Sequence, residues 1–185
     1  MNSNNFVPKK IFLTKGIGFH KEKLASFELA LREAGIAPLN LITVSSILPP
    51  HCKFIDKDDG VQLLKPGQIV PVVLAKSESN IPSTLVSSGV GVAVPRDKDH
   101  YGYLSEHHST GMNDIKMEEY VEDLAAEMLA TTYGIKFDPD ASWDEKRELW
   151  SIDNRIVKTR SEVQTGVVND EGHWTTTIAA AVLIL

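Results

Sequence analysis

Short apolar segments rich in valine, isoleucine and threonine recur along this chain of 185 residues, and they restrict it to a strand-rich fold. Helical spacing of apolar residues predicts only two long helices, one over 20–34 and one around Met117–Met128 that ends before Gly134. The predicted strands cover residues 10–14, 40–45, 68–75, 83–94, 101–106, 155–163 and 174–185. This order is typical of a mixed α/β (α+β) fold rather than a regular alternation of strand and helix.

The remaining segments connect these elements. A short helix or turn is expected over 56–65, and a loop with one helical turn over 138–150. Pro49 and Pro50 follow the second predicted strand and are expected to exclude regular structure there. No repeat or linker-like composition divides the sequence, so a single domain is expected over residues 1–185.

Charge and cysteine content argue against several classes of protein. A net charge of −6 argues against a protein that binds the nucleic-acid backbone, which normally shows a basic face. The single cysteine, Cys52, cannot form a disulfide within the chain, so a reducing compartment is expected. The start lacks an apolar segment of signal-peptide length, and the apolar end at 175–185 is too short to span a bilayer. We expect a cytoplasmic protein without nucleic-acid or membrane partners.

Two glycine motifs superficially resemble a dinucleotide-binding loop. Gly16-Ile17-Gly18 follows a predicted strand, but Lys21 stands where a third glycine is needed, and no acidic residue ends the second strand. We therefore predict a strand-to-helix turn that breaks the first strand at these glycines. Gly89-Val90-Gly91 fails the same test, and a strand with a bulge at one of its glycines is predicted instead.

Two other segments carry side chains that bind metals in other proteins. Asp56-Lys57-Asp58-Asp59-Gly60 lacks the spacing of a calcium loop, because its glycine comes one position early and no glutamate closes it. A solvated helix start is expected there. His107 and His108 are adjacent on a predicted strand and should point to opposite faces, so they form a poor ligand pair. We expect no metal site.

Ser45-Ser46 stands between an apolar strand and the rigid Ile47-Leu48-Pro49-Pro50 turn. The simplest interpretation is a strand end followed by a turn, where serine is common. The second interpretation is chemical. A serine hydroxyl can attack the carbonyl before it and convert the amide to an ester. Elimination and hydrolysis then cut the chain and leave a ketone, a pyruvoyl group, at the new amino terminus.

Residues 40–50, Asn-Leu-Ile-Thr-Val-Ser-Ser-Ile-Leu-Pro-Pro, closely resemble the cleavage segment of pyruvoyl-dependent arginine decarboxylases. The resemblance extends in the same order from about residue 8 to the end of the chain. It includes the segments 27–31, 34–36, 89–95, 101–108, 122–126 and 174–176. The chain is thereby identified as resembling a bacterial-type member of that family.

The resemblance implies a cut between Ser45 and Ser46, which gives a β chain of residues 1–45 and an α chain of residues 46–185. Ser45 supplies the carbonyl that is attacked, and Ser46 becomes the covalent pyruvoyl cofactor. Asn40 matches an asparagine that assists the cut, through a hydrogen bond to the developing oxyanion, or that holds the loop. A plain hydrogen bond at the strand edge is the alternative for Asn40.

The resemblance also implies decarboxylation of L-arginine to agmatine and CO2, as a step toward polyamines. Glu106 matches the proposed proton donor to the α-carbon, a role for which we expect a buried, protonated carboxyl. Glu28 matches an acidic residue that binds the guanidinium, and Leu31 and Ile47 match apolar residues beside the substrate. The alternatives are an exposed strand carboxylate for Glu106 and ordinary core positions for Leu31 and Ile47.

The family fold is a four-layer α-β-β-α sandwich, and its protomers form trimers that pair into hexamers, with active sites between neighbours. His51 departs from the resemblance, because many bacterial relatives have a smaller residue there, and we expect an effect on loop shape. A pyruvoyl decarboxylase for another amino acid remains an alternative. So does an uncleaved, non-catalytic oligomer that binds a cationic metabolite. The joint presence of Asn40, Ser46 and Glu106 favours an enzyme.

Overall fold

The computed structural model describes residues 6–134 and 156–185, so the loop predicted over 138–150 lies outside the described residues. All seven predicted strands and both long helices are confirmed. The helices are α1 (Lys23–Glu33), α2 (Lys57–Gln62) and α3 (Asp114–Thr132). The strands are β1 (Lys10–His20), β2 (Asn40–Thr43), β3 (Ile47–Leu48), β4 (Lys53–Phe54), β5 (Ile69–Ser79), β6 (Leu85–Pro95), β7 (Gly102–Thr110), β8 (Ile156–Val167) and β9 (Trp174–Ile184).

The first sheet has five strands in the order β2-β5-β9-β1-β4. Its central strand, β9, is buried from Thr175 to Ile184 because both of its faces are covered. A fully covered strand is expected to read as a nearly continuous run of apolar and small residues, which explains the sequence Ile-Ala-Ala-Ala-Val-Leu-Ile. The antiparallel pairing of β1 with β9 continues from Lys10↔Ile184 to His20↔Trp174.

The second sheet has four strands in the order β3-β7-β6-β8. Its central strand β6 is also buried along most of its length, and it pairs antiparallel with β7 on one side and with β8 on the other. Val92 and Leu104 of this sheet meet Ile11, Val73 and Leu183 of the first sheet in one apolar cluster between the two sheets. This cluster holds the two sheets together.

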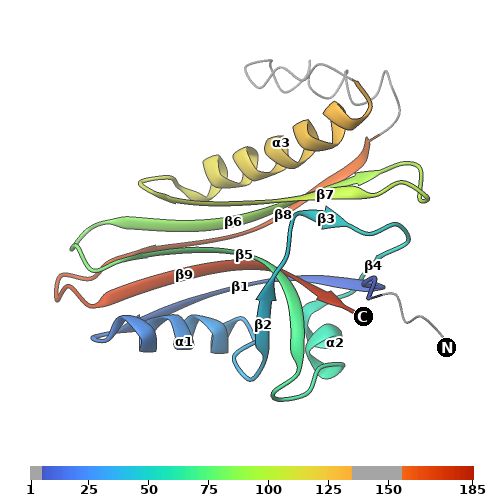
Figure 1. Cartoon of the computed structure of the whole chain (residues 1–185). Coiled ribbons are helices and arrows are strands. Elements are labelled where there is room, and N and C mark those ends of the chain that lie inside the picture. Colours follow the sequence, from blue (N-terminus) through green and yellow to red (C-terminus); the bar gives the residue numbers. More distant parts are fainter. Residues whose placement is uncertain (1–5, 135–155) are drawn as a thin grey trace.

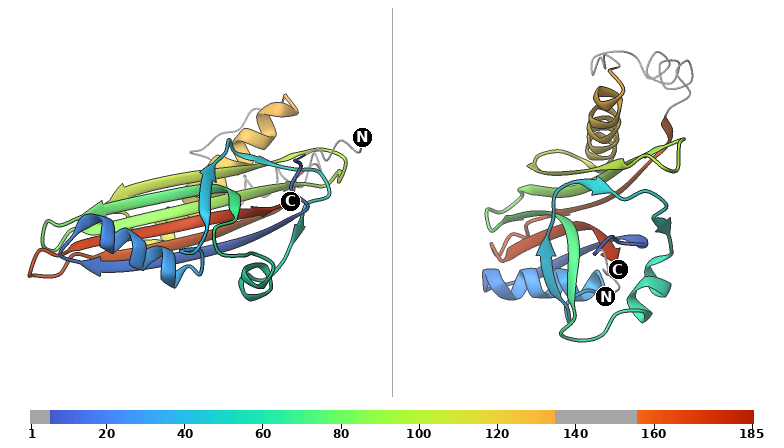
Figure 2. Two further views of the ribbon diagram at one scale, coloured as in Figure 1. Left: turned by 60° about the horizontal axis from the view of Figure 1, so that its bottom comes forward. Right: turned by 45° about the vertical axis from the view of Figure 1, so that its right-hand side comes forward.

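The helices cover the two outer faces of the sheet pair. α1 lies against β1 and β9, and α3 lies against β6, β7 and β8. Figure 2 shows α1 and α3 on opposite sides of the stacked sheets, and Figure 1 shows the same layers from a second direction. The four-layer α-β-β-α sandwich expected from the resemblance is therefore confirmed.

The predicted break at Gly16-Ile17-Gly18 is wrong, since β1 continues through these residues to His20. The glycines serve instead to admit α1. A Cβ on Gly16 would lie 2.1 Å from the Ala30 carbonyl oxygen, and one on Gly18 would lie 2.0 Å from the Ser26 carbonyl oxygen. Helix backbone thus replaces side chain on this face of the strand, a close approach that local sequence does not reveal.

The same arrangement recurs on the opposite face of the molecule. A Cβ on Gly91 would lie 2.1 Å from the Val121 carbonyl oxygen of α3, and one on Gly89 would meet Met117 at 2.7 Å. The predicted bulge at these glycines is wrong, because the register of β6 shifts only between Val94 and Pro95. Both helices therefore dock on a pair of glycines in the strand beneath.

We expect Gly91→Ala to destabilise the protein by about 3 kcal/mol or more, because the methyl group meets helix backbone that has little freedom to move. For a chain of this size, that change lowers the melting temperature by roughly 10 °C. Gly111→Ala is the comparison: its φ is +88°, but nothing lies within 4 Å of its Cβ position. Backbone strain alone should cost about 1–2 kcal/mol. Equal shifts in thermal unfolding would contradict the docking role.

The segments around Asp56, Pro49-Pro50 and His51 can each be compared with the expectation from the sequence. The helix start expected near Asp56 is confirmed, and in α2 a Cβ on Gly60 would lie 2.2 Å from the Phe12 ring. The strands β3 and β4, two residues each, were not predicted, and the prolines lie between them. His51 has a φ of 59°, in the left-handed region that favours glycine.

No helix within residues 6–134 and 156–185 is long and apolar enough to cross a membrane.

Candidate active site

The Ser45–Ser46 peptide bond lies where the chain passes from one sheet to the other. β2 pairs with β5 in the five-stranded sheet, and β3 pairs with β7 in the four-stranded sheet. The Val44 N–H still donates to the Val72 carbonyl, at 3.1 Å, whereas the Ser46 carbonyl already accepts from the Leu104 N–H, at 2.8 Å. Figure 1 shows this passage between the arrows β2 and β3. The chain is therefore held by the five-stranded sheet up to Val44 and by the four-stranded sheet from Ser46 onward.

The carbonyl of Ser45 already accepts a hydrogen bond. The Ile47 N–H donates to it at 2.8 Å and closes a three-residue turn with Ser46 at its centre. A donor on a carbonyl oxygen stabilises the negative charge that develops there when a nucleophile attacks the carbon. The turn therefore supplies one hydrogen-bond donor of an oxyanion site at the Ser45 carbonyl, next to the hydroxyl of Ser46.

Ser46 and Glu106, 60 positions apart in sequence, face each other. The Ser46 hydroxyl donates to Glu106 Oε2 at 3.4 Å. This proximity follows from register, because Leu104 binds the Ser46 carbonyl and Glu106 follows two residues later on the same face of β7. The structure thus brings together a hydroxyl, a carboxylate and a hydrogen-bonded carbonyl at one point.

The expectation that Glu106 is buried is wrong for this chain taken alone, since its side chain is exposed and Ser46 is half-buried. The reason is that β3, with only two residues, covers the outer edge of β7 only opposite Gly102 and Tyr103. The β7 residues that follow Leu104 on the same face, Glu106 and His108, are therefore exposed to solvent unless another chain covers them.

The neighbours of Glu106 on β7 and β6 define its surroundings. His107 turns toward α3, where its ring lies 4.3 Å from that of Tyr120, centroid to centroid. Burial and the adjacent His108 lower the pKa of His107 below its ordinary value. Across the sheet, Val90 of β6 is paired with Glu106 on one side and with Glu162 of β8 on the other. Within the described residues, no group of three metal-ligating side chains occurs.

Asn40 lies at the start of β2, five positions before Ser45. Its side-chain amide donates to the Gly67 carbonyl at 2.8 Å and thereby ties β2 to the turn that precedes β5. This contact corresponds to the alternative of a plain hydrogen bond at the strand edge rather than to a hydrogen bond with the Ser45 carbonyl.

The three residues predicted to bind substrate lie in two different layers. Glu28 is on α1, outside the five-stranded sheet, and its Oε1 accepts from Arg32 Nε at 2.5 Å. Leu31, also on α1, packs against the core beneath the helix. Ile47 is next to Ser46 on β3 and is 38% exposed. Figure 2 shows α1 outside the five-stranded sheet, whereas β3 belongs to the other sheet. One chain therefore does not gather these three residues around Ser46.

Sequence reasoning missed the backbone groups of the site. Leu104 and Ile47 act through their N–H groups, on the carbonyls of Ser46 and Ser45 respectively. Backbone groups leave no side-chain signal, and only the register of β3 against β7 reveals them. A longer run of strand-forming residues after Ser46 would have signalled β3, but Pro49 and Pro50 end the run after Ile47-Leu48.

The family described as pyruvoyl-dependent arginine decarboxylase matches residues 10–185. The chain belongs to this family. The pyruvoyl-dependent arginine decarboxylase 2 of Methanosarcina mazei is 51% identical over 178 residues, which cover 96% of this chain and 97% of the relative. The pyruvoyl-dependent arginine decarboxylase of Nitrosopumilus maritimus is 48% identical over 181 residues, covering 98% and 99%. A probable pyruvoyl-dependent arginine decarboxylase of Chlorobium limicola is 51% identical over 180 residues, covering 97% and 99%.

Membership in the pyruvoyl-dependent arginine decarboxylase family implies a covalently bound pyruvoyl cofactor, and the residues at the junction fit one. Ser46 has the hydroxyl that the conversion needs. Its own carbonyl accepts from the Leu104 N–H, so residue 46 is anchored in the four-stranded sheet, on the carboxyl side of the bond. The Glu106 carboxylate faces the Ser46 hydroxyl. A serine hydroxyl beside a carboxylate at this junction fits the cofactor of the family.

Proposed function

We propose that this protein cuts itself between Ser45 and Ser46 and then decarboxylates L-arginine to agmatine and CO2. The observation that carries the proposal is the 3.4 Å approach of the Ser46 hydroxyl to Glu106 beside a hydrogen-bonded Ser45 carbonyl. The names of the relatives give the substrate class. The products of the cut are a β chain of residues 1–45 and an α chain of residues 46–185.

In the cut, the Ser46 hydroxyl adds to the Ser45 carbonyl carbon and the peptide C–N bond breaks, which leaves an ester and a free amine. The Ile47 N–H stabilises the oxyanion of the addition step. Loss of the Ser46 Cα proton then breaks the Cβ–O bond and releases the carboxylate of Ser45. Water finally replaces ammonia at the Cα of residue 46. Asn40 contributes by fixing the start of β2 through Gly67.

In turnover, the pyruvoyl group supplies an electron sink for the pair left behind by CO2. The residues of the chain do the rest. Leu104 holds the carbonyl next to the reacting carbon, and Glu106 delivers a proton to the substrate α-carbon. A carboxyl that delivers a proton must first hold one. We therefore propose that a neighbouring chain covers Glu106 and excludes water from it.

Apolar surface beside the junction supports such a neighbour. Ile42 on β2 is 51% exposed and Ile69 on β5 is 62% exposed, and β2 is the edge strand of its sheet. An edge strand with exposed apolar residues is a usual site for association with another chain. We propose a homo-oligomer, a trimer or a dimer of trimers, in which α1 of one protomer reaches the Ser46 of the next.

That assembly gives Glu28 its role. Its carboxylate binds Arg32 within one helix, an exposed pair that contributes little stability and exchanges readily for a better partner. The guanidinium of arginine offers a bidentate partner of the same kind. Leu31 and Ile47 would flank the aliphatic part of the substrate.

We expect Glu28→Gln to raise the KM for arginine about 10- to 100-fold, because one charge-assisted hydrogen-bonded pair contributes roughly 1.5–3 kcal/mol. Self-cleavage should be unchanged, since Glu28 lies in a different layer from Ser46. Steady-state CO2 release gives the KM. Glu22→Gln, an exposed carboxylate just before α1 whose side chain makes no capping hydrogen bond, is the matched control. Equal effects of the two changes would contradict a guanidinium contact.

An intact mass spectrum and a substrate panel test the proposed function directly. Two fragments split after Ser45, the larger with a terminal ketone, together with faster CO2 release from arginine than from lysine or ornithine, are expected. Cleavage with a preference for lysine or ornithine would instead indicate a pyruvoyl decarboxylase of another amino acid. A single full-length mass after prolonged incubation would support the non-catalytic binding protein.

A further inference from the structure

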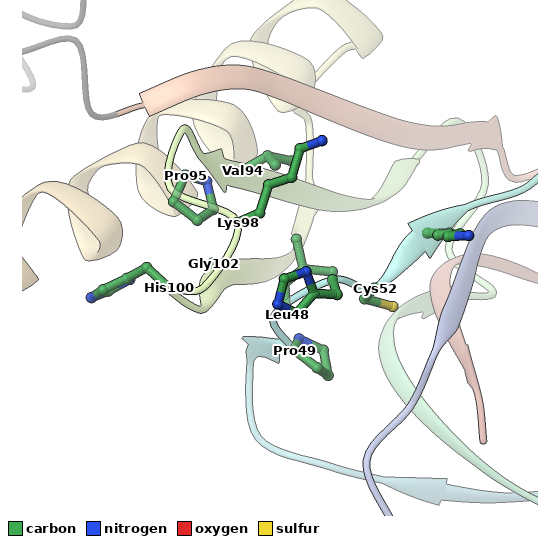
Figure 3. A pocket seen from close by; sticks show the side chains of 10 residues that line it. Leu48, Pro49, Cys52, Val94, Pro95, Lys98, His100 and Gly102 are labelled. Atoms are coloured by element: carbon green, nitrogen blue, oxygen red, sulfur yellow. The ribbon is translucent and has the colours of Figure 1, made fainter.

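A hollow of about 340 Å³ lies on the carboxyl side of the proposed cut, between the β3–β4 segment and the β6–β7 loop. Neither Ser45 nor Ser46 nor Glu106 lines it, so it is distinct from the junction. Figure 3 shows Leu48, Pro49 and Cys52 along one wall and Val94, Pro95 and Lys98 along the other. The floor is therefore largely apolar and formed from two segments that are distant in sequence.

The rim of the hollow is basic. Lys53, Lys98, His51 and His100 line it, and no carboxylate does. Both lysine side chains belong to exposed residues, and within the described part of the chain neither ammonium group forms an ion pair. Unpaired ammonium groups beside an apolar floor fit a ligand with an apolar part and a negative charge.

The two carboxylates of the β6–β7 loop make other contacts. Asp99 Oδ1 lies 2.8 Å from His51 Nε2, and Asp97 Oδ1 accepts from the Asp99 N–H at 2.9 Å. Cys52 adds no charge, because burial raises the pKa of its thiol to about 11. Within the described residues, neither carboxylate pairs with Lys53 or Lys98, and the flexible stems of the two lysines allow their ammonium groups to reach across the opening.

We propose that this hollow is a binding site for a small organic anion, with its apolar body against Leu48, Pro49, Val94 and Pro95 and its carboxylate between Lys53 and Lys98. A ligand there would join the two segments that the pairs Ile47↔Tyr103 and Leu48↔Gly102 already join. It would thereby hold the chain at Leu48, two residues after Ser46. This inference concerns binding alone and does not rest on the proposed function.

Binding of benzoate, its uncharged isostere benzamide and inorganic phosphate to the full-length protein tests the proposal. We expect saturable benzoate binding by calorimetry, at least tenfold tighter than that of either comparison compound. Amide chemical shifts should change most at Cys52 and Gly102, which line the hollow. The double variant Lys53→Met/Lys98→Met should bind benzoate at least tenfold more weakly.

The matched control is Lys21→Met/Lys116→Met, which removes two positive charges from exposed lysines outside the hollow. It should change the affinity for benzoate less than twofold. Equal weakening by both double variants would show a general charge effect and overturn the site. So would equal affinity for benzamide, equal affinity for phosphate, or no saturable binding. If the first double variant does not fold, the ligand comparison and the chemical shifts of the unmodified protein decide.

Discussion

Ser46→Ala is expected to leave one uncut chain of 185 residues without decarboxylase activity. The change removes the hydroxyl that adds to the Ser45 carbonyl and the atoms from which the ketone forms, so both processing and turnover are lost. Because enzymes commonly accelerate their reactions by 10⁶-fold or more, the loss should reach the detection limit. Intact mass measures the cut, and CO2 release from arginine measures turnover.

Ser45→Ala is the matched control, because it changes the other serine of the pair but leaves the carbonyl in place. The Ser45 carbonyl is held by the Ile47 N–H through backbone atoms alone, so the turn should form and the cut should still occur. Fragments from Ser46→Ala, or identical behaviour of the two variants, would contradict the assignment of the nucleophile. An uncut but fully active Ser46→Ala protein would contradict the role of the ketone.

The elements that local sequence predicted correctly are those whose own pattern determines them. The apolar run of β9 and the spaced apolar residues of α3 belong to this group. The error at Gly16 and Gly18 has a non-local cause: glycine breaks an isolated strand, but here the helix that packs on it requires glycine. Contacts with segments elsewhere in the chain determine β3 and β4 in the same way.

The candidate site also has a part that the sequence could identify and a part that depends on contacts between distant segments. The resemblance identified Ser46 and Glu106, and the register of β3 against β7 explains why they meet. It did not reveal that Glu106 is exposed in one chain or that Glu28 belongs to the opposite layer. Both facts depend on how layers and chains are arranged, which a motif does not encode. They are also the facts that make a second protomer necessary for the proposed mechanism.

Glu106→Gln is expected to reduce kcat by about 10²- to 10⁴-fold, the range for removal of a positioned proton donor. Glutamine retains the size and the hydrogen-bonding ability of the side chain, so the Ser46 contact and the cut should persist. The loss should appear in kcat and not in the fraction of chains that are cut. The measurements are kcat against pH on fully processed protein and, separately, the fraction of chains cut.

Glu162→Gln offers a close control within the same sheet. Val90 is paired with both glutamates, so Glu162 lies in the same row, about 10 Å from Glu106 across two strand spacings. Its ion pair with Lys15, at 3.0 Å, is partly exposed and contributes little to stability. We expect its kcat and pH profile to match those of the unmodified enzyme. A similar loss in both variants would mean that the sheet needs carboxylates generally, and Glu106 would then no longer be the specific proton donor.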